Sequence, residues 1–401
     1  MLSYEPRPLD DDESVEMESF VALIDTIVSS VDVSDVSSLP DAEIYDSLSI
    51  EDFVISKVKS ETVRHEISTF FESVLSCDVS DCSFLFALWY LASSGGLETL
   101  GDNTPTSSQM YVLGDPAGPS EICSRLARRL REDAGVTFFT AARATSVNHV
   151  SNDEIVLETD DRIITCRRCV FAMNPALAFA TVRFDPELPL EKKNLGRNVL
   201  SGHVIKIYLC YDRPFWDGDA NGSGESRDND RGVNRDNDVD TVIDRGRSNL
   251  AVSEMFPAKN IFYSKKIGGH HSIVALITGK TCMSVLGMTE GQRKDLLLKQ
   301  LRDMYPEVEG SIINRPLAYL EKNWCTDALS GGCFTNGYRS FIGVRSALQT
   351  PLDGRVFFAS SETSDEFCGY MEGALTAGDR VSDMILKSLD SNAKINDTLL
   401  G

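Results

Sequence analysis

Apolar and polar residues alternate with helical spacing through the first quarter of the chain. Between residues 20 and 28, apolar side chains recur at steps of three and four and form one face. Segment 83–91 is apolar nearly all round, which predicts a buried helix, and Gly95 and Gly96 follow it as a helix end. We therefore expect a helical region over 16–94.

Short apolar runs at close spacing predict β-strands in the rest of the chain. The runs occupy 136–139, 144–150, 155–158, 163–164, 169–172, 203–211, 261–263, 272–278 and 356–359. Helical patterns lie at 119–131, 290–304 and 372–388. With 401 residues, the chain is long enough for two domains of mixed α/β structure.

Two stretches lack such patterns. Residues 217–247 consist largely of Asp, Asn, Arg, Gly and Ser, which predicts a disordered insert. Residues 1–15 are expected to form a disordered acidic tail.

Composition limits the partners and the compartment. The formal net charge of −22 argues against a basic face for nucleic acid or for an anionic membrane. No apolar run reaches the ~18–20 residues needed to span a bilayer. Ten scattered cysteines without a secretory signal indicate reduced thiols in an intracellular protein.

No metal site is expected. Cys166 and Cys169 form a lone CxxC, without the second pair that a zinc site would need. The five histidines show no ligand spacing, and His270 and His271 are adjacent.

The most informative segment lies near the C-terminus. It reads NW at 323–324, SGGCFT at 330–335, FASSET at 358–363 and GYMEGA at 369–374. This pattern resembles the flavin-containing monoamine oxidases. The resemblance spans roughly 53–389, and it implies an FAD/NAD(P)-binding Rossmann-like domain of the glutathione-reductase-like kind, joined to a substrate domain of mixed sheet and helices.

The resemblance also divides the chain. It implies that 16–110 is the helical part of the substrate domain, 111–185 an FAD-domain segment and 186–322 the substrate-domain sheet. The segment 323–390 would be the C-terminal FAD-binding segment, followed by a tail at 391–401. No Gly-x-Gly-x-x-Gly stands near Met1, so the Rossmann-like domain is expected to be N-terminally incomplete by a βαβ unit of about 30 residues.

By this resemblance, FAD is held covalently, as a thioether of Cys333. Gly331 and Gly332 give the backbone the freedom to approach a flavin closely. Phe334 and Tyr370 occupy the places where the family has two tyrosines that form the walls around the amine.

Lys206 lies mid-strand among apolar residues, where a charge is costly without a partner or a role. In the family, a lysine in this Val-Ile-Lys context holds a water beside the reactive flavin nitrogen. The alternative is an edge-strand lysine that points to water.

Further cofactor contacts are implied for residues around these positions. They are Trp324, Ser360, Glu362, Thr363, Tyr370, Met371 and Ala144. A helix that begins near Met371 would direct its positive dipole end to the cofactor. Ser360 replaces a glycine that the family usually has, so its side chain could crowd FAD.

The expected activity is oxidation of a primary or secondary amine by O₂ to an imine and then an aldehyde, with hydrogen peroxide. The alternative is a catalytically dead, FAD-free remnant that binds an amine or a partner. A polyamine or amino-acid oxidase shares the fold but generally lacks the covalent cysteine, so Cys333 argues against it. A homodimer is compatible with the resemblance. Some family members are anchored in the mitochondrial outer membrane by a C-terminal tail that this sequence lacks, which leaves a cytoplasmic location open.

Overall fold

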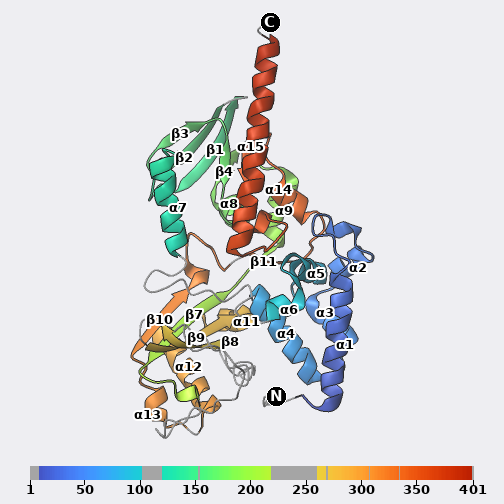
Figure 1. Ribbon diagram of the computed structural model, residues 1–401, viewed down its shortest axis with the longest axis vertical. Helices are drawn as coiled ribbons and strands as arrows, with labels where there is room; N and C mark the ends of the chain where they lie inside the picture. The colour runs from blue at the N-terminus through green and yellow to red at the C-terminus, as the bar shows by residue number, and fades with distance from the viewer. Residues whose placement is uncertain are drawn as a thin grey trace.

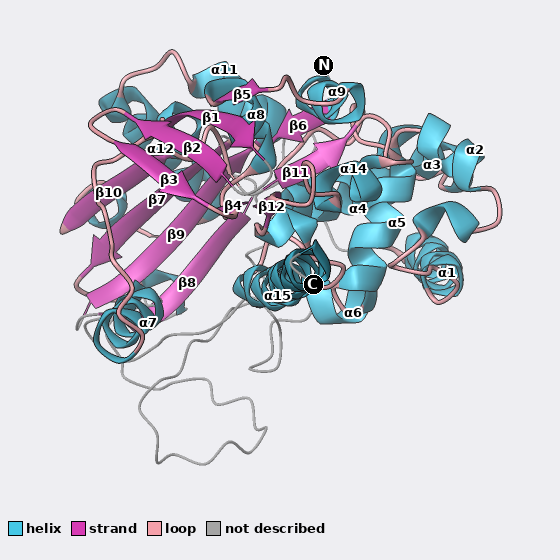
Figure 2. Ribbon diagram, turned by 90° about the horizontal axis from the view of Figure 1, so that it is seen from above, coloured by secondary structure: helices cyan, strands magenta, loops and turns pink. Residues whose placement is uncertain are grey.

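The computed structural model of the chain describes residues 9–101, 120–151, 154–217, 260–267, 270–306, 308–333 and 335–399. The N-terminal helices lie on one side, and the sheets lie on the other (Figures 1 and 2). A long C-terminal helix, drawn in red, projects from the top of the molecule in Figure 1.

The N-terminal region is helical, as predicted. Its elements are α1 (Asp11–Val28), η1 (Val36–Ser38), α2 (Ala42–Ser47), α3 (Ile50–Lys57), α4 (Glu61–Leu75), α5 (Phe84–Ser93) and α6 (Gly96–Gly101). Helix α5 carries the apolar run, and Leu85, Leu88 and Trp89 are almost completely buried in the core of this region. Burial on all sides explains why α5 has no polar face.

The predicted disordered tail over 1–15 is wrong for its second half. Helix α1 begins at Asp11, and Asp10 and Glu13 close a capping box across its first turn. The Glu13 N–H donates to Asp10 Oδ1 at 2.9 Å, and the Asp10 N–H donates to Glu13 Oε2 at 3.2 Å. Acidic residues here stabilise a helix N-terminus instead of marking disorder.

One of the sheets is antiparallel and has four strands. Its order is β10-β7-β9-β8, from β7 (Val204–Tyr211), β8 (Asn260–Ile267), β9 (His270–Thr278) and β10 (Ala318–Asn323). Helices α11 (Gly279–Val285), α12 (Glu290–Met304) and α13 (Gly310–Ile313) accompany it. Ile205, Ile207 and Leu209 of β7 pack with Leu297 and Leu301 of α12 in one buried cluster.

The other strands form a second sheet region. A sheet of order β3-β2-β1-β5 contains β1 (Ala144–Ser151), β2 (Glu154–Thr159), β3 (Ile163–Cys166) and β5 (Arg183–Asp185). Strands β4 (Cys169–Phe171) and β12 (Val356–Phe358) pair in parallel, and β6 (Val199–Ser201) pairs with β11 (Thr335–Tyr338). The remaining elements are α7 (Ser120–Asp133), α8 (Pro175–Thr181), α9 (Leu190–Asn198), η2 (Phe215–Asp217), η3 (Trp324–Thr326), α14 (Val344–Gln349), η4 (Ser361–Thr363) and α15 (Met371–Leu399).

Other boundaries differ from the expectations. Residues 136–139 form no strand, because no neighbouring strand pairs with them among the described residues. Helix α15 continues to Leu399, through the predicted tail at 391–401. The predicted insert 217–247 lies outside the described residues, except for Asp217, which ends η2. In the described part of the chain, we find no helix that is both long and apolar enough to cross a membrane.

Candidate active site

The helical region, the sheet that contains β7 and the C-terminal segment meet around a cavity of about 820 Å³. The residues predicted from the sequence that line it are Lys206, Trp324, Gly332, Cys333, Glu362 and Tyr370. Since these residues come from distant parts of the chain, the fold itself collects them in one place.

Cys333 reaches the cavity through a glycine turn. Gly331 has φ of 66° and Gly332 has φ of 145°, conformations that a residue with a side chain rarely adopts. The Gly331 N–H donates to the Asp327 carbonyl at 2.8 Å, and the Cys333 N–H donates to the Gly202 carbonyl at 2.8 Å. These two bonds fix the turn at both ends and place the cysteine at the cavity wall.

Lys206 lies on a central strand. β7 pairs with β10 on one side and with β9 on the other, so the edge-strand alternative is wrong. Because side chains alternate along a strand, burial of Ile205 and Ile207 against α12 turns Lys206 to the opposite face, where it lines the cavity. Its Nζ lies 5.3 Å from the centre of the Tyr208 ring.

Two tyrosines form aromatic walls. Tyr370 follows Gly369, which has φ of 85°, and its ring centre is 6.5 Å from that of Tyr90 in α5. Burial, with a further contribution from Tyr370, raises the pKa of the Tyr90 hydroxyl well above its usual value. The predicted wall residue Phe334 lies outside the described residues.

A second cavity of about 580 Å³ adjoins the first and shares Ala172, Met173, Asn174 and Glu362 with it. Ser360 lines this cavity at the end of β12, and α15 forms part of its wall. The two cavities therefore run from the turn that carries Cys333 past the carboxyl ends of β4 and β12, the edge where parallel sheets bind ligands.

Comparison with known proteins identifies the family. Residues 12–386 match the family model described as flavin containing amine oxidoreductase. The chain belongs to this family.

Sequence relatives include flavin-containing amine oxidase A of Equus caballus, 27% identical over 360 residues, which cover 88% of this chain and 61% of the relative. Flavin-containing amine oxidase B of Homo sapiens is 25% identical over 355 residues, with 87% and 61% covered. The chain thus spans about 61% of the length of these curated relatives.

Solved structures share the fold. Cyclohexylamine oxidase from Brevibacterium oxydans IH-35A superimposes with a TM-score of 0.76 at 20% identity, covering 94% of this chain and 75% of that one. Putrescine oxidase bound to putrescine gives a TM-score of 0.77 at 18% identity, covering 96% and 78%. These likenesses confirm the expected class of fold.

Membership of the amine oxidoreductase family implies a flavin cofactor, and the polar atoms of the cavities fit such a group. Ser330 Oγ in the first cavity and Ser360 Oγ in the second are buried and have no hydrogen-bond partner among the described residues. Because buried hydroxyls are usually satisfied, both atoms are suited to a polar ligand. The Ser360 side chain therefore offers a hydrogen bond at the position where crowding was expected.

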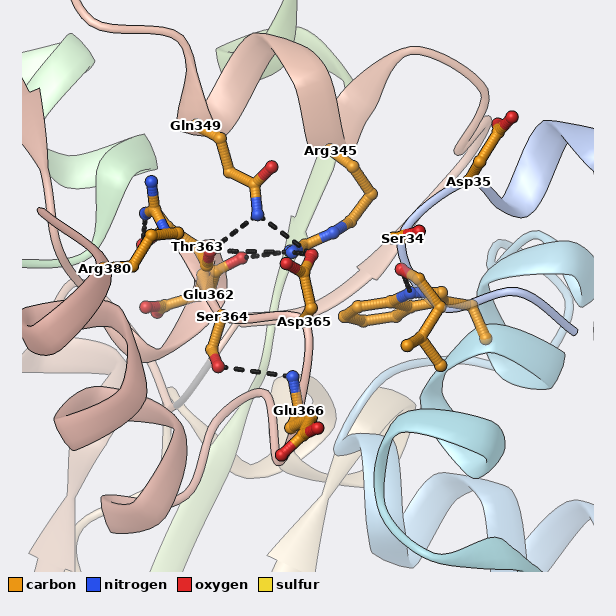
Figure 3. A network of polar contacts seen from close by, with 12 residues as sticks. Ser34, Asp35, Arg345, Gln349, Glu362, Thr363, Ser364, Asp365, Glu366 and Arg380 are labelled. Carbon is orange, nitrogen blue, oxygen red and sulfur yellow. Dashed lines mark hydrogen bonds and ion pairs between the residues drawn. The ribbon is translucent and has the colours of Figure 1, made fainter. Parts of the chain in front are cut away.

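A polar network holds the Ser360–Glu366 loop in place (Figure 3). The Thr363 hydroxyl donates to the Ser360 carbonyl at 2.8 Å and accepts from Arg380 Nη2 at 3.0 Å. Arg345 Nη1 donates to the Glu362 carbonyl at 2.9 Å, and its guanidinium stacks 4.6 Å from the Trp89 ring. The Thr363 side chain is completely buried within this loop and lines neither cavity. Its geometry therefore fits a residue that holds the loop in position.

Three other predicted residues also lie away from the cavity walls. Gly331 acts through the turn, Met371 is 54% exposed at the start of α15, and Ala144 packs at the margin of the β1–β5 sheet. Position 373 requires glycine for a structural reason, because a Cβ there would lie 2.2 Å from the Phe367 carbonyl oxygen. The backbone of the first turn of α15 therefore packs closely against the loop that precedes it.

Sequence reasoning missed several cavity residues. They are Ser73, Ser76, Tyr90 and Asn174. The sequence held a signal for two of them: Tyr90 carries a hydroxyl in a largely apolar helix, and Asn174 follows the end of β4 by three positions and caps α8. The sequence gives no signal for Ser73 and Ser76, at the end of α4, because only the packing of α4 against the sheets brings them to the cavity.

Proposed function

We propose that this protein is a monoamine oxidase-like flavoenzyme that oxidises a primary or secondary amine with O₂ to an imine and then an aldehyde, releasing hydrogen peroxide. The observation that carries the proposal is the single cavity of about 820 Å³ that holds Cys333, Lys206 and Tyr370 together. Family membership supports the reaction class.

Each residue has a defined task in this proposal. Cys333 holds the flavin through a thioether, and Trp324, Glu362 and Ser360 line the space that it occupies. When bound, a flavin supplies a two-electron acceptor. Tyr370 and Tyr90 exclude water and orient a neutral amine between aromatic surfaces. The Lys206 ammonium holds a water and stabilises negative charge that develops on oxygen during its reduction.

The first experiment is an intact-mass measurement of the protein from its natural source under denaturing conditions. We expect a flavin adduct that maps to Cys333 and is lost in a Cys333→Ser variant. Cys210→Ser is the matched control, because this half-buried cysteine of β7 does not line the cavity. Peroxide release with a panel of amines then tests turnover.

A chain without an adduct and without bound flavin would contradict the proposal. Amine binding measured by calorimetry on such a flavin-free chain would instead support the second candidate, an amine-binding protein without catalysis. The tyrosine pair in the cavity favours that candidate over a purely structural role.

A further inference from the structure

Cys282 and Cys325 bring two thiols into contact at one end of the β10-β7-β9-β8 sheet. Their Sγ atoms are 3.6 Å apart, although 43 positions separate the residues. Cys282 lies in α11, which follows β9, and Cys325 lies in η3, which follows β10. Because β9 and β10 flank β7, both strands deliver their following cysteines to the same end of the sheet.

The two thiols differ in exposure. Cys282 is completely buried, and Cys325 is half-buried. Burial raises the pKa of the Cys282 thiol strongly, and the nearby Cys325 raises it further. Oxidants react with thiolates that they can reach. Cys325 is therefore the thiol that reacts first with an oxidant, and Cys282 is the resolving thiol that reacts with the oxidised Cys325.

The pair adjoins the candidate active site. Cys325 directly follows Trp324, which lines the larger cavity and lies under the Lys322 ammonium, 4.8 Å from Nζ to the ring centre. A change at this pair would therefore act on the wall that carries the flavin-binding turn.

We propose that Cys282 and Cys325 are a modification site, a dithiol that hydrogen peroxide converts to a disulfide. The Cys325 thiolate attacks one peroxide oxygen, the O–O bond breaks, and a sulfenic acid and hydroxide form. The Cys282 sulfur then attacks the Cys325 sulfur, the S–O bond breaks, and water leaves. In total, two thiols are oxidised and one peroxide is reduced to two waters.

This site does not depend on the proposed function, because peroxide from any source oxidises it. Under the proposed function, the oxidant would arise in the adjoining cavity. The test below uses added hydrogen peroxide, so a negative result leaves the amine oxidase proposal standing. Failure of the amine oxidase proposal would likewise leave this disulfide proposal standing.

The chain contains a matched control pair. The thiols of Cys77 and Cys82 also interact, but both residues are almost completely buried. If contact alone sufficed, both pairs would oxidise together. If an accessible member is needed, only the Cys282–Cys325 pair would oxidise.

The test is peptide mapping after peroxide treatment of the purified protein. A Cys123→Ser background removes an exposed thiol that could cross-link two molecules. We expect a Cys282–Cys325 disulfide that dithiothreitol reverses, forming at least about tenfold faster than any loss of the Cys77 and Cys82 thiols.

Single variants separate the two roles. In Cys282→Ser, Cys325 should accumulate as a sulfenic acid that dimedone traps, whereas in Cys325→Ser the Cys282 thiol should stay reduced. The proposal is overturned if the Cys282 and Cys325 thiols survive peroxide that oxidises Cys123 in the parent protein. Over-oxidation of Cys325 without a cross-link, or equal oxidation of Cys77 and Cys82, would also overturn it. The mapping of the parent chain decides the matter even where a variant fails to fold.

Discussion

At the scale of single residues, Lys206 shows how strand alternation places a charge. Its neighbours Ile205 and Ile207 are completely buried, so the ammonium faces the cavity and not the core. The sequence could predict this residue because a lysine within an apolar strand needs a partner or a role. It could not predict Tyr90, whose contribution depends on how α5 packs against the C-terminal segment.

Under the proposed function, we expect Lys206→Met to leave the fold intact and to slow the O₂-dependent step about ten- to a hundredfold, because it removes the positive charge assigned to the developing oxygen anion. Stopped-flow reoxidation of the reduced flavoprotein measures this step. Lys299→Met is the control, since Lys299 forms an exposed pair with Asp303 on α12. An unchanged reoxidation rate in Lys206→Met would refute the role.

Lys192 is a buried lysine, unlike the half-buried Lys206, and its pKa predicts a pH dependence of stability. Burial lowers the pKa of this ammonium to about 8, although it donates to the Ala347 carbonyl and lies 4.4 Å from the Phe358 ring centre. Between pH 8 and the unfolded pKa of about 10.4, the unfolded chain binds more protons than the folded one, so stability rises with pH.

The comparison with Lys192→Met isolates this effect. The free energy of unfolding of the parent chain, relative to that of the variant, should increase by about 2 kcal/mol from pH 7 to pH 10. Urea unfolding at several pH values measures it. A relative stability that falls over this range would show that the ammonium is not destabilised by burial.

At the scale of elements, α7 shows that hydrophobic periodicity predicts a helix but not the surface against which the helix packs. Its pattern indicated a helix, and the structure confirms one at Ser120–Asp133. Ile122, Leu126 and Leu130 form an apolar stripe, yet none of the α7 side chains is buried among the described residues. Periodicity gives the face of a helix, but the packing partner comes only from tertiary structure.

This exposure gives a stability prediction. Leu126→Glu should change the free energy of unfolding by less than about 0.5 kcal/mol, because the side chain is 49% exposed. Leu88→Ala in α5 should cost about 2–5 kcal/mol, because that side chain is completely buried. Urea titrations of both variants provide the comparison, and a large loss in Leu126→Glu would mean that α7 is covered in solution.

At the scale of the whole molecule, contacts between distant parts of the chain build the site. The Phe367 N–H donates to the Ser93 carbonyl at 2.9 Å, and the Ser83 N–H donates to the Tyr338 carbonyl at 2.8 Å. The sequence predicted the two kinds of domain segment from their motifs. It could not predict how α5 would meet the segments after Cys333, since no motif records a contact between them.

Asp46 is a polar link in this interface. Its buried carboxylate accepts from the Ser83 hydroxyl at 2.8 Å, the Ser340 hydroxyl at 2.7 Å and the Phe341 N–H at 2.6 Å. Asp46→Ala would leave these donors unsatisfied and should cost about 3 kcal/mol. Glu43→Ala on the same helix, at an exposed position, is the control. Equal midpoints in thermal unfolding for the two variants would contradict this role.

The alternation along β7 also has a genetic consequence. Ile205, Ile207, Leu209 and Tyr211 pack in the buried cluster with α12, whereas Lys206 on the opposite face lines the cavity. Deleting or inserting one codon between Val204 and Tyr211 would shift part of the strand by one position, exchange the two faces there, and place isoleucine in the cavity or the ammonium in the core. A change of two codons would restore the parity. Length variants in this strand should therefore survive selection mainly in even steps.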